Sequence, residues 1–175
     1  MTITEVKKLH ELAVAKDFAK YITTTDLYTV NKTPDPPDAI LKSTNGEYLW
    51  IEITDVFRTA EEAKEVYSSA IGRDYEHTQG LIVGPDRKIT YSTVISVEKK
   101  MNKTSYQNVL EKYGKGILIL WIYDPLFSDS TLERIMEEFS AEHFSSKYFK
   151  EVYIYWPGGR GRIFTRILGQ DHKDL

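Results

Sequence analysis

The stretch TPDPPDAILKSTNGEYLWIEITDVF, residues 33–57, decides the fold expected of this chain. It holds two apolar segments separated by the dipeptide Asn45-Gly46. Asn-Gly between apolar segments is the strongest short-range signal of a β-hairpin, because both residues tolerate the left-handed backbone of a tight turn. The sequence therefore predicts antiparallel strands over residues 39–42 and 48–54, joined by a two-residue turn.

The predicted turn also fixes the register between these strands. Thr44 is expected to oppose Glu47, and counting outward along the ladder brings residue 39 opposite Glu52. Asp38 then lies within one residue of Glu52 on the neighbouring strand. Two carboxylates in this arrangement, with an open cleft above them, supply the oxygen ligands that a hard divalent cation prefers.

Glu52 is unusual because it lies in the middle of an apolar strand that is expected to be mostly buried. Side chains alternate along a strand, so Glu52 shares a face with Trp50 and Thr54. Burial of an unpaired carboxylate costs several kcal/mol, so this side chain needs a partner. Two explanations are open: a metal ion shared with Asp38, and a salt bridge to a lysine or arginine from a neighbouring helix.

Outside the hairpin, expected helices and strands alternate along the chain. Apolar periodicity predicts an amphipathic helix over residues 4–22, and a short strand follows at 27–30. The elements expected after the hairpin are a helix at 59–71, a short strand at 89–92, a helix at 96–113, a strand at 117–123, a helix at 130–144, a strand at 152–156 and a terminal hairpin through 162–168. This interleaving predicts a single α/β domain over residues 1–175, with helices on both faces of a mixed sheet.

The composition is that of a folded globular protein, with 41% apolar and 28% charged residues. The chain has no cysteine, which excludes disulfides, thiolate zinc sites and cysteine nucleophiles and fits a reducing compartment. The polar N-terminus lacks a secretory signal, and no segment approaches the roughly 18 apolar residues of a membrane span. A cytoplasmic protein without membrane contact is expected.

Charge is distributed unevenly along the sequence. The net charge of −3 argues against a nucleic-acid binder if it is taken alone. Residues 87–123 and 143–175 are basic, however, whereas residues 1–86 and 124–142 are acidic. Acidic and basic blocks together could form a metal-holding carboxylate cluster beside a phosphate-binding surface, although solvated helix faces are the preferred explanation of any single block.

Pro37-Asp38, followed after the turn by Glu52-Ile53-Thr54, resembles the motif of the PD-(D/E)xK nuclease superfamily. The resemblance implies the restriction-endonuclease-like fold, a three-layer α/β/α arrangement around a central mixed sheet. It also implies that Asp38 and Glu52 bind Mg²⁺ or Mn²⁺, together with the main-chain carbonyl of Ile53. A water molecule on that metal would attack a phosphodiester bond.

The sequence departs from this pattern at Thr54, which stands where the family has a lysine. A lysine at that place would activate the attacking water and offset developing negative charge, and a threonine hydroxyl supplies no positive charge. Some members of the superfamily recruit a lysine from elsewhere. The candidates are Lys42 on the strand of Asp38, and Lys99 and Lys103, one turn apart on the helix expected beside the site. Surface solvation is the alternative role for each of them.

The resemblance implies a further acid, because the first helix of many members presents one towards the site. Glu11 is the candidate metal ligand on this helix, with Glu5 behind it, and solvation on the polar helix face is the alternative. Arg58 follows the central strand. It could receive a phosphate group, but we expect it to neutralise Asp55 instead.

Two groups of basic residues are candidates for binding nucleic acid. They are Lys99, Lys100 and Lys103 on the expected helix, and Arg160, Arg162 and Arg166 around a glycine-rich turn. Main-chain N–H groups in such a turn can also face an anion. No pairing of histidines by strand or helix spacing is present, so a histidine zinc site is not expected.

Two functions from different classes follow from these observations. The first is a Mg²⁺-dependent nuclease, or nuclease-like enzyme, that acts on DNA in preference to RNA. The second is a catalytically inactive module of the same fold that binds nucleic acid or a protein partner. The resemblance also implies a homodimer or a partner subunit for either function, because many relatives of this fold act in that way. Thr54 and the net negative charge favour the second function, and the pairing of Asp38 with Glu52 favours the first.

Overall fold

The computed structural model describes residues 1–23, 27–73, 84–141, 146–158 and 161–169. Its elements are α1 (Ile3–Tyr21), β1 (Tyr28–Lys32), β2 (Ala39–Ser43), β3 (Tyr48–Val56), α2 (Ala60–Ala70), α3 (Pro85–Met101), the 3₁₀ helix η1 (Thr104–Tyr106), α4 (Gln107–Tyr113), β4 (Gly116–Ile122), α5 (Asp129–Ala141), β5 (Phe149–Gly158) and β6 (Gly161–Leu168). No helix in the described part of the chain is both long and apolar enough to cross a membrane.

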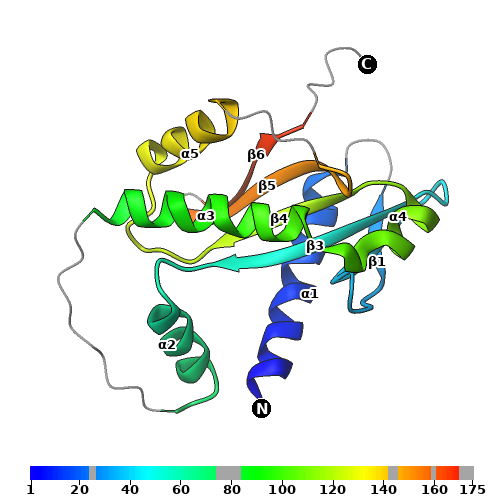
Figure 1. Ribbon diagram of the computed structural model, residues 1–175. Coiled ribbons are helices and arrows are strands. Elements are labelled where there is room, and N and C mark those ends of the chain that lie inside the picture. Colours follow the sequence, from blue (N-terminus) through cyan, green and yellow to red (C-terminus); the bar gives the residue numbers. More distant parts are fainter. Residues whose placement is uncertain (24–26, 74–83, 142–145, 159–160, 170–175) are drawn as a thin grey trace.

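The six strands form one mixed sheet in the order β1-β2-β3-β4-β5-β6 (Figure 1). Strands β1 to β3 form an antiparallel meander. Strands β3, β4 and β5 are parallel to one another, and helical segments connect them. Strand β6 returns antiparallel to β5, as the expected terminal hairpin. The predicted α/β class with a mixed sheet is therefore confirmed.

Helices cover both faces of this sheet, because the strands bury side chains on both sides. On one face, Phe18 of α1 packs in a core cluster with Ile51 of β3 and Ile119 of β4. On the other face, Ile89 of α3 and Ile135 of α5 share a second cluster with the sheet. Strand β4 is buried almost throughout, as its continuous apolar sequence predicts.

The hairpin forms where the sequence predicts it, but its turn is one residue longer than expected. The N–H of Ser43 donates to the carbonyl of Glu47 at 2.9 Å, and the N–H of Gly46 donates to the carbonyl of Ser43 at 3.0 Å. Gly46 has φ +85°, the left-handed conformation that a three-residue hairpin loop uses. The expected two-residue turn is therefore wrong, and every cross-strand pair is shifted by one residue.

The region after α2 also differs from the sequence-based expectation. Residues 89–92 belong to α3 rather than to a strand, since Ile89, Thr93 and Val97 are buried at four-residue steps on one helix face. The β-branched residues of this segment gave it a misleading strand-like composition. The helix expected over residues 96–113 is in fact interrupted at Lys103, whose backbone is extended.

Strands β2 and β3 differ in length, and this difference leaves an edge of the sheet open. The last pair between them joins Ala39 to Ile51, whereas β3 remains paired with β4 as far as Val56. Within the described residues, no strand covers the outer edge of β3 beyond Ile51. Helices α1, α2 and the C-terminal end of α3 surround this open edge (Figure 1).

The close approach of β4 to Trp50 generates a stability prediction. A Cβ atom on Gly116 would lie 2.3 Å from the Trp50 ring. That ring is fully buried, and its Nε1 donates to the carbonyl of Gly114 at 2.7 Å. We expect Gly116→Ala to lower the free energy of unfolding by about 2 kcal/mol, as overpacking does, in urea denaturation. The cost should fall in a Trp50→Phe background, and an equal cost in both backgrounds would rule out the clash.

Candidate functional site at the open edge of β3

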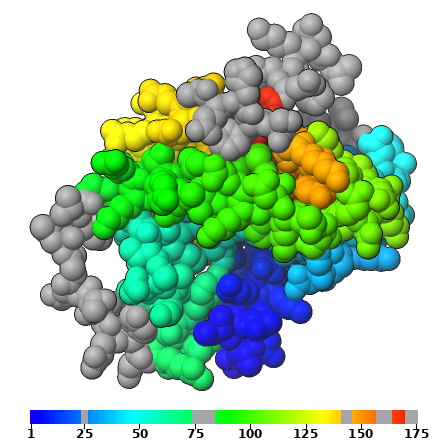
Figure 2. Space-filling view, in the orientation of Figure 1, coloured from blue at the N-terminus to red at the C-terminus, as the bar shows by residue number. Residues whose placement is uncertain are grey.

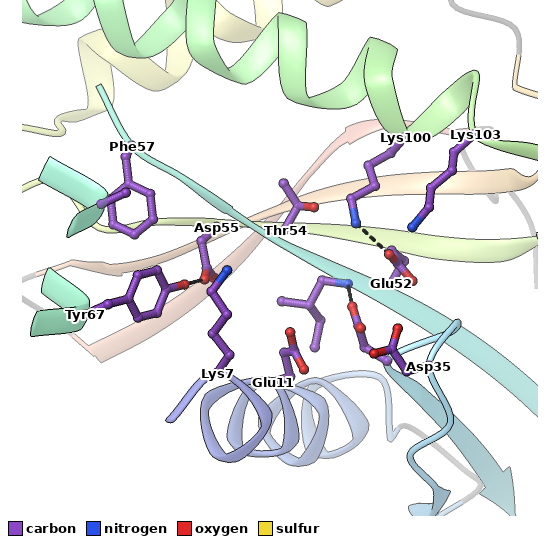
Figure 3. A pocket seen from close by; sticks show the side chains of 13 residues that line it. Lys7, Glu11, Asp35, Glu52, Thr54, Asp55, Phe57, Tyr67, Lys100 and Lys103 are labelled. Carbon is purple, nitrogen blue, oxygen red and sulfur yellow. Dashed lines mark hydrogen bonds and ion pairs between the residues drawn. The ribbon is translucent and has the colours of Figure 1, made fainter. Parts of the chain in front are cut away.

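A hollow of about 420 Å³ lies at the open edge of β3. Its walls come from α1, α2, β3, the segment before β2 and the C-terminal end of α3 with the residues that follow it. Figure 2 shows the surfaces of α1, α2 and α3 meeting on this face of the molecule. The carboxylates that line the hollow are Glu11, Asp35, Asp38, Glu52 and Asp55, and the lysines are Lys7, Lys100 and Lys103 (Figure 3).

Glu52 is buried, with 2% of its surface exposed. Its Oε1 accepts two hydrogen bonds, from Lys100 Nζ at 2.5 Å and from the Tyr106 hydroxyl at 2.7 Å. Its Oε2 is also buried and has no hydrogen-bond partner in the described part of the chain. The salt bridge from a neighbouring helix, one of the two explanations for this buried acid, is therefore present. It occupies one oxygen and leaves the other without a partner.

Asp38 is held beside Glu52 by the backbone of β3. Its Oδ2 accepts the N–H of Ile53 at 2.6 Å, in the place that a longer β2 would occupy. Continuing the observed register by one residue brings Asp38 level with Glu52. Burial, followed by the negative charge of Glu52, raises the pKa of Asp38 to about 7. The structure therefore brings together the two acids that the sequence paired.

Glu11 extends from α1 into the same hollow, as the sequence candidate for a third acid. Burial raises its pKa to about 7, and the charges of Asp55, Asp35 and Glu52 add to this effect. Glu5, the weaker candidate, instead caps the first turn of α1, where its carboxylate accepts the N–H of Thr2 at 2.7 Å.

The lysines of the hollow agree only in part with the candidates that the sequence offered for the missing motif lysine. Lys103 lines it, as expected, and Lys100 does so in place of Lys99, which is exposed and not among the lining residues. Lys42 lies outside the hollow with its Nζ 5.6 Å from the ring centre of Tyr48. Thr54, in the motif position of the lysine, lines the hollow and brings only a hydroxyl group.

Lys7 is a lining residue that the sequence analysis missed. It comes from the exposed start of α1, and its Nζ lies 4.8 Å from the centre of the Tyr67 ring. Nothing in the local sequence marks it, because its place depends on how α1 and α2 pack. Helical spacing does supply a signal, since Lys7 and Glu11 are four residues apart and share a face of α1.

Asp55 forms a second polar cluster at the other end of the hollow. It accepts a hydrogen bond from the Tyr67 hydroxyl, and His10 Nδ1 lies 3.4 Å from its Oδ1. The His10 ring in turn lies against Trp121, with centroids 3.9 Å apart. Burial raises the pKa of Asp55 to about 6, while Lys7 opposes the shift.

Arg58 does not neutralise Asp55, so that expectation is wrong. Its guanidinium lies 2.8 Å from Glu62 and 3.2 Å from Asp124. These contacts tie the start of α2 to the end of β4, because Glu62 is on α2 and Asp124 follows β4. Arg58 is thereby committed to a structural role away from the acids of the hollow.

The second basic group named from the sequence is only partly described. Arg160 lies outside the described residues, and Arg162 belongs to β6, where it is paired with Pro157. The guanidinium of Arg166 lies 3.3 Å from Glu151. Binding of nucleic acid by Arg160 and Arg162 stays a prediction.

The first site prediction concerns the pH dependence of stability. The pKa of Asp38 is higher in the folded protein than its ordinary value, so the folded state loses stability as the pH rises from about 4 to about 7. Asp38→Asn retains an oxygen for the Ile53 N–H and does not ionise. Relative to wild type, we expect it to gain about 1–2 kcal/mol between about pH 5 and about pH 8 in metal-free urea denaturation. A pH-independent difference between the two proteins would contradict this.

A second prediction concerns the charge pair at the centre of the hollow. Lys100→Met leaves the buried carboxylate of Glu52 with one donor fewer, so we expect a loss of about 2–3 kcal/mol in unfolding free energy. The double variant Lys100→Met/Glu52→Gln should be more stable than the sum of the single changes predicts. Additive effects in urea denaturation would show that the two side chains do not depend on each other.

The chain was also compared with known proteins. No protein-family model, curated protein or solved structure matched it. The described residues contain no group of three or more histidine, cysteine, aspartate or glutamate side chains placed to hold a metal ion. The chemistry of the hollow therefore has to be argued from Asp38, Glu52 and the lysines around them.

Proposed function

We propose that this protein is a metal-dependent phosphodiester hydrolase that acts on nucleic acid, DNA in preference to RNA, with Mg²⁺ or Mn²⁺ bound by Asp38 and Glu52. The observation that carries the proposal is the buried Oε2 of Glu52, which has no partner among the described residues, in a side chain that lines the hollow together with Asp38. A buried carboxylate oxygen without a partner is unfavourable, and a cation would relieve it.

The residues present fit a hard divalent cation in three respects. Asp38 and Glu52 supply carboxylate oxygens, which Mg²⁺ prefers. The N–H and C=O of a strand residue project from the same edge, so the carbonyl of Ile53 projects towards the side where its N–H meets Asp38. Because the carboxylates of the hollow repel one another, a cation would also lower the electrostatic cost of ionising Asp38 and Glu11. A cation site made of these two carboxylates and one main-chain oxygen would need no third acidic side chain.

Side chains around the acids would then have distinct roles. A divalent cation in this place would activate water and polarise a phosphoryl oxygen. Lys100 and Tyr106 hold Oε1 of Glu52 and so fix the direction of Oε2. Lys103 lines the hollow with its Nζ 5.2 Å from the centre of the Tyr106 ring, and it would offset charge on a phosphate bound there. Lys100 and Lys103 thus supply the charge that Thr54 lacks.

The arrangement of the elements supports the restriction-endonuclease-like fold as part of this proposal. A helix, a three-strand meander and a crossover to a parallel fourth strand follow one another in the order expected of that family's core. One acid, Asp38, lies directly before β2 and the other, Glu52, lies in the middle of β3, which agrees with the motif resemblance.

A specific observation favours a second candidate, the catalytically inactive module that binds nucleic acid or a protein partner. Lys100 already lies 2.5 Å from Glu52 and compensates its charge without any metal. Thr54 supplies no ammonium group in the motif position. A protein of this kind would keep the hollow as a binding surface and would cleave nothing.

Cleavage assays separate the two candidates. We expect purified protein with Mg²⁺ or Mn²⁺ to cleave plasmid DNA or short single-stranded DNA or RNA. Asp38→Ala and Glu52→Ala should each lower the rate about 100-fold or more, since each removes a ligand of the proposed metal. Glu133→Ala is the matched control, because Glu133 is an exposed acid on α5 outside the hollow.

Metal-dependent melting tests the same site without requiring turnover. At a metal concentration about ten times the dissociation constant, the melting temperature should rise by about 3–5 °C in wild type and not in Asp38→Ala. Wild-type protein that shows neither cleavage nor this rise would reject the hydrolase and leave the binding module. A higher melting temperature of Asp38→Ala in metal-free buffer would point to repulsion between the acids.

A further inference from the structure

The hollow has two chemically different ends (Figure 3). Asp38, Glu52, Lys100 and Lys103 form one end. At the other end, beyond Asp55, the wall is apolar and aromatic, and this part of the hollow has no role in metal binding or bond cleavage as proposed above.

Phe57 and Tyr67 form the aromatic wall. Phe57 follows the last residue of β3, and Tyr67 belongs to α2. Their rings make an edge-on pair with centroids 5.8 Å apart. The hydrogen bond from the Tyr67 hydroxyl to Asp55 fixes the orientation of that ring, and Ala63 of α2 keeps the wall open because its side chain is small.

Tyr67 is buried, but these two rings lie outside the two main clusters of the hydrophobic core. Neither Phe57 nor Tyr67 belongs to the core clusters on the two faces of the sheet, or to the apolar residues packed against them. Tyr67 holds α2 in place as its buried residue. Phe57 is only half-buried and lines the hollow, so its ring presents apolar surface to a ligand.

We propose that this aromatic end binds the base of one unpaired nucleotide, so that the substrate is single-stranded or locally unpaired nucleic acid. The proposal rests on the proposed function and specifies its substrate class. Aromatic side chains bind bases by stacking, and every base has a face that can stack. A base within a duplex is covered on both faces by its neighbours and would have to leave the stack to reach Phe57.

The size and charge of the hollow agree with one nucleotide. The whole hollow measures about 420 Å³, which lies within the range of sites that bind a small organic ligand, and α1, α2 and the C-terminal end of α3 form its walls. Lys7 lies between the two ends with its ammonium over the Tyr67 ring and its side chain exposed. It can therefore turn to a phosphate of the nucleotide bound beside it.

Variants of Phe57 test the base-binding end directly. Phe57→Leu keeps an apolar side chain without a ring face, and Phe57→Tyr keeps the ring. Tyr48→Ala is the matched control, because Tyr48 is an exposed aromatic residue at the opposite end of β3, outside the hollow. Affinity is measured by fluorescence anisotropy with a labelled single-stranded oligonucleotide and the duplex of the same sequence. In these binding measurements Ca²⁺ takes the place of Mg²⁺ at the proposed cation site, because Ca²⁺ also prefers oxygen ligands.

We expect wild type to bind the single strand at least about tenfold more tightly than the duplex. Phe57→Leu should weaken single-strand binding about tenfold, the size of one lost stacking contact, and Phe57→Tyr should restore it. Duplex binding should stay the same in Phe57→Leu. Equal single-strand affinities of Phe57→Leu, Tyr48→Ala and wild type, or equal wild-type affinities for the two nucleic acids, would overturn the proposal.

The metal-dependent rise in melting temperature tests the proposed metal site and does not involve Phe57. The base-binding end and the hydrolase can therefore fail independently of each other. If the rise and the cleavage occur and binding does not depend on the ring of Phe57, the base-binding end is rejected and the hydrolase stands. If single-strand binding depends on the ring but neither cleavage nor the rise occurs, the base-binding end stands and the hydrolase is rejected.

Discussion

The buried carboxylate of Glu52 is the constraint around which this side of the molecule is organised. A charge with so little exposed surface is tolerated only if donors from other elements reach it. Lys100 reaches it from the last turn of α3, and Tyr106 reaches it from η1. The interruption of the helical segment at Lys103 makes this possible, because the extended residue redirects the chain and turns Tyr106 beneath the strand. One buried acid thus fixes β3, α3 and η1 relative to one another.

The open edge of β3 has a comparable structural cause. Strand β2 begins at Ala39, directly after the proline-rich segment, and leaves the N–H of Ile53 without a strand partner. The side chain of Asp38 supplies the missing acceptor. A backbone donor that the sheet would otherwise leave unsatisfied is therefore what holds Asp38 next to Glu52. The two acids therefore lie close together because β2 begins only at Ala39 and Asp38 takes the place of a further strand residue beside β3.

The sequence predicted the hairpin and the pairing of Asp38 with Glu52, because turn chemistry and strand alternation are local properties. The turn was one residue longer than expected, and this error shifted the register in the direction that brings the two acids level. The choice of Lys100 over Lys99 was predictable in principle from helix geometry, since Lys100 lies three residues after the buried Val97. Tyr106 was not predictable, because its position depends on how separate elements pack, and the only sequence signal for Lys7 is its four-residue spacing from Glu11.

The charges of the side chains around the hollow help to decide between a structural role and a ligand-binding role. A structural salt bridge accounts for Glu52 and Lys100 and requires no other acid nearby. Asp38 and Glu11 nevertheless converge on the same space, where burial and mutual repulsion oppose their ionisation. This convergence lowers the stability of the folded state at neutral pH, so stability alone does not explain it. Charges that oppose folding and surround a buried oxygen without a partner are typical of a functional site, and they are the reason for proposing a cation as its ligand.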